Sequence, residues 1–76
     1  MQHLTIQALT NRTLKSHLDA AREAFRRHRL ANRQGRLYDL YVEHNLFDEA
    51  RKSRSVMLAH LRAARSHWRT VLGISP

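Results

Sequence analysis

Apolar side chains recur along the C-terminal third of the chain at the spacing of a helix that packs against another helix. The seven-residue repeat consists of Ala50, Met57, Ala64 and Val71. Leu61 and Trp68 follow two of these positions by four residues, whereas Arg54 interrupts the second line. A stripe with this period buries itself against a neighbouring helix. The pattern predicts a helix from Asp48 to Leu72, with Asp48 as its N-cap.

A second apolar stripe precedes it. It is formed at steps of four, three and four residues by Leu14, Leu18, Ala21 and Phe25. This spacing places all four on one side of a helix over residues 12–32, and we expect that side to face the core. Glu23 and Arg27 are spaced for an ion pair on this helix. Gly35 is the only glycine in the interior of the chain, and we expect it to end the helix.

The segment between the two long helices predicts a short third helix. Its helically spaced positions are Leu37, Leu40, Tyr41 and His44. Asn45 tolerates a left-handed backbone and would end it. Residues 1–10 alternate apolar and polar side chains, as a strand does, but also allow a helical face. The pattern leaves their conformation open, as a flexible or strand-like arm or as a helix.

These elements predict an all-α fold in one small domain, residues 1–76. The expected architecture is a helical hairpin of two long helices with a short helix in the connection. A chain of 76 residues without cysteine has no disulfide or thiolate metal site to stabilise it. We therefore expect a homodimer, completed as a helical bundle. The lack of cysteine and of a secretory signal suits the cytoplasm.

The charged residues of the chain indicate its function rather than its fold. The chain has 14 basic and 6 acidic residues, and all but two of the basic ones are arginine. Arginine offers a planar set of donors that matches phosphate and carboxylate. On the predicted helices the arginines fall into lines beside the apolar stripes, and a hairpin would bring them into one basic face. The candidate anion-binding residues are Arg22, Arg26, Arg29, Arg33, Arg51, Arg54, Arg62, Arg65 and Arg69.

Nucleic acid, DNA or RNA, is the partner that such a face favours. A non-catalytic regulatory or architectural protein is the function that we expect. The alternative is an adaptor or inhibitor, of the kind that phages and other mobile elements encode, that docks on an acidic surface of another protein. Tyr38 and Trp68 are the candidate stacking residues or interface anchors. Binding to an anionic membrane ranks last, because the apolar stripes are needed for the core.

The remaining motifs argue against catalysis and against a bound cofactor. The serines and carboxylates form no catalytic constellation, and the two glycines form no phosphate-binding loop. The six histidines show no metal-binding spacing, so no metal is expected. We expect His28 and His44 to be half-buried and hydrogen-bonded, because both continue apolar stripes.

Two DNA-binding motifs compete with the basic hairpin. Residues 3–9, HLTIQAL, followed by an amphipathic helix, resemble the opening of the ribbon-helix-helix family. That resemblance implies a dimer whose paired strands present His3, Thr5 and Gln7 to bases. It covers about thirty residues and finds no counterpart of the second helix. A helix-turn-helix is disfavoured because the helix after Asn45 is too long and too apolar to lie freely in a groove.

Overall fold

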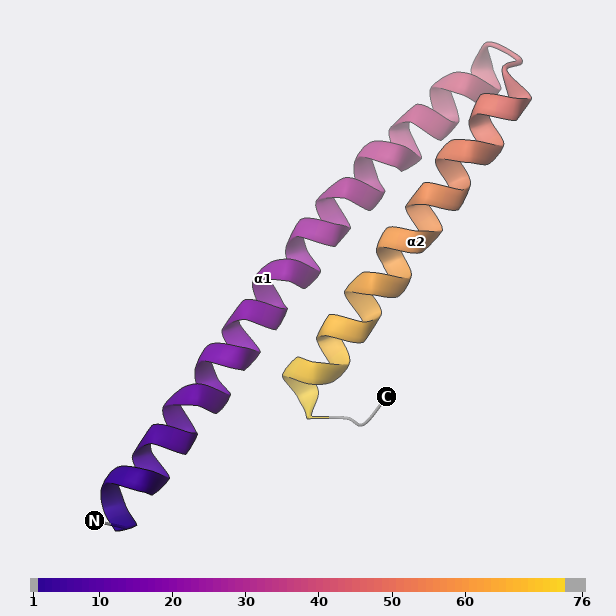
Figure 1. Cartoon of the computed structure of the whole chain (residues 1–76). Coiled ribbons are helices and arrows are strands. Elements are labelled where there is room, and N and C mark those ends of the chain that lie inside the picture. The colour runs from indigo at the N-terminus through magenta and orange to yellow at the C-terminus, as the bar shows by residue number, and fades with distance from the viewer. Residues whose placement is uncertain (1, 74–76) are drawn as a thin grey trace.

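The computed structural model describes residues 2–73, and their side chains from Leu14 onward. Within that range the chain is two antiparallel helices, α1 (Gln2–Glu43) and α2 (Phe47–Leu72), with no strand. Figure 1 shows them side by side as an open hairpin, with the N-terminal turns of α1 continuing past the end of α2. The molecule measures 66 × 19 × 12 Å along its principal axes. The predicted all-α hairpin of two long helices is confirmed.

The N-terminal arm and the short connecting helix are both absent, because α1 is continuous. Gln2 to Thr10 are helical rather than strand-like, which removes the resemblance to paired strands. A helix that already exists extends without a new nucleation step, and the only proline is Pro76. The stop predicted at Gly35 is also wrong. A glycine inside a helix costs about 1 kcal/mol relative to alanine, which the flanking turns readily offset.

The turn between the helices is short and closes by a Schellman arrangement. Asn45 has a φ of 60°, so the predicted left-handed ending is confirmed. The Leu46 amide donates to the Tyr41 carbonyl at 2.8 Å, and the Asn45 amide donates to the Val42 carbonyl at 3.0 Å. These two bonds satisfy carbonyls that the end of α1 leaves open.

The ends of α2 differ from one another. The predicted cap at Asp48 is wrong: Leu46 occupies the N-cap without a side-chain hydrogen bond, and Asp48 lies in the first turn. The predicted end is confirmed, since Gly73 adopts a left-handed backbone with a φ of 71°. Its amide donates back to carbonyls of the last turn.

The two helices meet along a seam of small and polar residues. On α2 the predicted repeat is confirmed, since Ala50 and Ala64 are buried and Met57 and Val71 are half-buried. The second line of the seam is three residues on rather than four. It consists of Ser53, His60 and His67. The predicted line of Leu61 and Trp68, which Arg54 interrupts, lies one residue further along the sequence. The α1 side of the seam repeats with the same period through His17, Ala20, Ala24, Arg27, Ala31, Gln34, Tyr38 and Tyr41.

The apolar stripe predicted to face the core of α1 lies outside the seam. Leu14, Leu18 and Phe25 are each more than half exposed. A two-helix hairpin has one interface, so it covers one stripe on each helix. The stripe that it covers is the one whose alanines let the two backbones approach closely. The bulky stripe beside it is left uncovered, which is the main correction to the sequence-based fold.

Candidate nucleic-acid interface

Five arginines follow the outer surface of α1 and form what we call the α1 arginine line. They are Arg22, Arg26, Arg29, Arg33 and Arg36, and all are exposed. Arg22 and Arg29 each stand two residues after a seam position, which is about 200° around the helix. They therefore point away from α2. Arg36 continues the line and was not among the candidates, although its spacing of seven from Arg29 is visible in the sequence.

Only one member of the α1 arginine line is paired within the described part of the chain. Arg26 donates to both carboxylate oxygens of Glu23, from Nε at 2.9 Å and from Nη2 at 2.5 Å. The hydrogen bonds and charge of Arg26, reinforced by Arg27, lower the pKa of Glu23 to about 2. Glu23 also raises the pKa of Arg26. Arg26 is thus the member of the line that is least available to a ligand.

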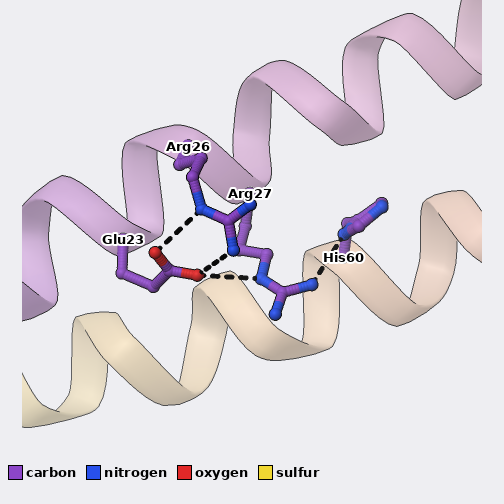
Figure 2. A network of polar contacts seen from close by, with 4 residues as sticks. All are labelled: Glu23, Arg26, Arg27 and His60. Carbon is purple, nitrogen blue, oxygen red and sulfur yellow. Dashed lines mark hydrogen bonds and ion pairs between the residues drawn. The ribbon is translucent and has the colours of Figure 1, made fainter.

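Arg27 belongs to the seam, not to the line. Its Nε donates to Glu23 Oε1 at 3.2 Å, which confirms the predicted pair, and its Nη1 lies 3.0 Å from Nδ1 of His60 on α2. Figure 2 shows this network crossing from one helix to the other. A guanidinium only donates hydrogen bonds, so His60 must accept through an unprotonated Nδ1. The network orients the two helices and is not an anion site.

The arginines of α2 are distributed over more than one side of that helix. Arg62 and Arg69 lie two residues after seam positions and point away from α1, with Arg65 rotated toward one flank. We call these three the α2 arginine line. Arg51 forms an ion pair with Asp48, whereas Arg54 is exposed near the turn. The outward surfaces of two antiparallel helices are opposite edges of the hairpin. The lines therefore do not merge into the one basic face that the sequence suggested.

The two candidate stacking residues are both half-buried. Tyr38 lies on the seam, where it packs between the helices, although a stacking residue or interface anchor has to be exposed. Trp68 packs edge-on against Phe25 with ring centroids 5.1 Å apart, and its Nε1 donates to His28 Nε2 at 2.9 Å. The exposed ring at this site is Phe25 itself, 55% exposed. It lines a shallow open depression together with Arg22, Arg26 and Arg29 and with the acidic Asp19 and Glu23. The sequence pattern had assigned Phe25 to the core.

The histidines behave in two ways. His28 is half-buried and hydrogen-bonded, as predicted, whereas His44 is exposed at the turn, so its prediction is wrong. Among the side chains that the structure describes, from Leu14 to Gly73, no three histidines or carboxylates gather as a metal site would require. Neither described helix has the length and apolarity of a membrane span.

Comparison of the chain with protein-family models, with curated proteins and with solved structures found no match. Its function is therefore inferred from its own residues.

Proposed function

We propose that this protein binds nucleic acid through the α1 arginine line and acts in a non-catalytic regulatory or architectural role. The observation that carries the proposal is the set of outward arginines that form no ion pair within the described part of the chain. In the described part of the chain no hydrogen bond or ion pair engages Arg22, Arg29, Arg33 or Arg36. The six acids cannot neutralise fourteen bases, so much of this charge needs a partner from outside the chain.

The dimensions of the line suit a phosphate backbone. From Arg22 to Arg36 the helix rises about 21 Å. That length covers about six base pairs of duplex at 3.4 Å per step. Guanidinium groups distributed over such a length can each meet a different phosphate along one strand. The open, shallow surface around them also favours an extended polymer over a small molecule, which binds in concave pockets.

Phe25 supports single-stranded nucleic acid as one form of the ligand. Its ring is exposed in the same depression as Arg22, Arg26 and Arg29. Stacking of a base on an aromatic ring contributes about 1–3 kcal/mol and tolerates any base. Phosphate contacts from the arginines and stacking on Phe25 would then act on neighbouring parts of one strand.

The direct test is fluorescence anisotropy with labelled duplex DNA, single-stranded DNA and RNA over a range of salt concentrations. Engagement of about five phosphates predicts a slope of the log association constant against log salt near −4.5 on duplex. No binding at low salt, or binding that ignores salt, would refute the proposal.

Matched charge variants locate the site. Arg29→Glu should weaken binding at least tenfold, because it removes one phosphate contact and adds a repelling charge. Lys52→Glu makes the same change in net charge at an exposed position of α2 that belongs to neither arginine line, and should have a much smaller effect. Equal losses would show that only bulk charge matters. Recovery of one acidic protein by the nuclease-treated chain, without nucleic-acid binding, would favour the adaptor function instead.

A further inference from the structure

Bulky apolar side chains gather on one broad side of the hairpin. Trp68 contacts both Phe25 and His28, which identifies the flanks of the two helices that share this side. Most of the exposed bulky apolar residues in the described part of the chain occupy the heptad positions of Phe25, His28 and Trp68, or the positions next to them on the same flank. We call them the apolar face: Leu14, Leu18, Phe25 and Val42 on α1, and Phe47, Leu61 and Leu72 on α2.

The interior of the hairpin is too small to account for a stable fold. The buried apolar residues of the described part are all alanines: Ala20, Ala24, Ala31, Ala50 and Ala64. No large side chain is fully buried there. Covering bulky apolar side chains is a main source of folding stability, and the apolar face of a single hairpin leaves that contribution unused. A two-helix chain of this size needs a second layer of helices to cover its apolar face. Another copy of the same chain can supply that layer, because it is present wherever the chain is present.

The charged residues on this side of the molecule favour a second copy as the partner and indicate how it is oriented. Along the flank of α1 from Leu14 to Val42 the charged residue is Asp39, whereas the flank of α2 carries Arg51, Arg54 and Arg65. A copy that placed α2 on α2 would bring arginines against arginines. A copy that places α1 on α2 brings the acidic flank against the basic one. The chain is therefore complementary to itself in one arrangement.

We propose that two copies pack through their apolar faces into a four-helix bundle, with α1 of each copy on α2 of the other and both turns at the same end. Asp39 lies two heptads after Phe25 on α1, and Arg54 lies two heptads before Trp68 on α2. They are level along the bundle, so each Asp39 lies opposite the Arg54 of the other copy. The two-helix part of the hairpin is about 39 Å long, the length of the 26 residues of α2, and 19 Å wide. A face of this size is of the order of the roughly 800 Å² per partner that a standard interface buries.

This arrangement also brings arginines of two chains together, a consequence that rests on the proposed function. It covers Phe25, so base stacking on that ring is open to the monomer and not to the dimer. When α1 of one copy lies on α2 of the other, their outward surfaces form one edge of the bundle. The α1 arginine line of one copy then runs beside the α2 arginine line of the other. Each edge presents a basic strip from two chains, which a single hairpin does not have.

The experiment is a mixing test of the full-length chain by sedimentation velocity and light scattering. Asp39→Arg and Arg54→Asp each oppose like charges in their own homodimer, so each variant alone should be mainly monomeric where the wild type is dimeric. An equimolar mixture restores both intermolecular pairs and should recover dimers. Mixing changes only the charge pairs between chains and leaves those within one chain as they were. If the mixture does not recover dimers, the proposed arrangement is wrong. A monomeric wild type at every concentration overturns the dimer.

A second pair of variants tests the face itself. Leu18→Gln should weaken the dimer at least tenfold, because it removes an apolar contact from the apolar face. Leu40→Gln alters another exposed leucine, 47% exposed against 57% for Leu18, on the other side of α1 and should leave the dimer unchanged. Circular dichroism confirms that both variants remain helical. Equal effects of the two would contradict the assignment of the face.

The same samples separate this inference from the proposed function. A dimer that does not bind nucleic acid would refute the proposed function and leave the bundle standing. A monomer that binds nucleic acid through the α1 arginine line would refute the bundle and leave the proposed function standing.

Discussion

At the residue scale, Glu23 connects the surface of α1 to the seam. Its carboxylate accepts from Arg26 on one side and from Arg27 on the other. Arg27 in turn reaches His60 on α2. One acid thus offsets part of the local positive charge around two adjacent arginines and fixes the one that crosses the seam. The spacing of Glu23 and Arg27 predicted their pair, whereas the link to His60 depends on how the two helices align.

Glu23 should give the folded protein a specific acid sensitivity. Its pKa falls from 4.5 to about 2 on folding, chiefly through the hydrogen bond from Arg26. A lowered pKa means that the stabilisation is fully present above pH 4.5 and is lost as the pH falls through about 2. Urea unfolding at pH 5 and at pH 2 should show a larger loss for the wild type than for Glu23→Gln. Equal losses in the two proteins would remove this role of Glu23.

At Gly35 a small side chain can be added without a steric clash. A Cβ built there lies 3.5 Å from Met57 Sδ, an ordinary van der Waals contact. Gly35→Ala should therefore stabilise the protein by about 0.5–1 kcal/mol, through the helix propensity of alanine. Gly73→Ala is the control with the opposite sign, because Gly73 has a φ of 71° that alanine adopts poorly. Chemical denaturation measures both, and destabilisation by Gly35→Ala would contradict a continuous α1.

At the scale of elements, the seam depends on small side chains. Ala24 and Ala64 are fully buried. Close packing of the two helices leaves no room for a larger side chain at these two positions. The seven-residue repeat on α2 was predicted from the sequence. Its partner stripe on α1 was not, because Leu14, Leu18 and Phe25 form a stronger apolar signal beside it.

A buried and an exposed alanine on α2 test this packing. Ala64→Leu should destabilise the protein by about 1–3 kcal/mol, since the larger side chain forces the helices apart. Ala59→Leu places the same side chain on an exposed position of α2 and should change stability by less than about 0.5 kcal/mol. Thermal or urea unfolding provides the comparison. Equal effects of the two substitutions would show that the seam does not run through Ala64.

At the scale of the whole molecule, the large positive charge acts on two associations in opposite directions. Two copies of charge +8 repel one another, and salt screens that repulsion. Salt also competes with arginine for phosphates. The proposed dimer and the proposed nucleic-acid complex should therefore respond to salt with opposite signs.

This leads to a prediction that needs only the wild-type chain. Raising sodium chloride from 50 to 500 mM should lower the dissociation constant of the dimer, as measured by sedimentation equilibrium. It should raise the dissociation constant for labelled duplex over the same range. By reciprocity, a short duplex added at low salt should also favour the dimer, because it neutralises the strips that two copies share. A dimer that weakens with salt would mean that the pairs between Asp39 and Arg54 outweigh the net repulsion.

The sequence by itself determined the helical class, the hairpin, the repeat on α2 and the helix ends at Asn45 and Gly73. These features depend on local backbone preference and on the period of apolar residues, both of which are properties of a short segment. Only the tertiary structure decided which stripe of α1 is covered, that Gly35 lies inside a helix, and that the arginine lines occupy opposite edges. Each of these depends on how two segments align across the hairpin. That alignment is set by the close approach of alanines, which a sequence pattern dominated by leucine and phenylalanine does not reveal.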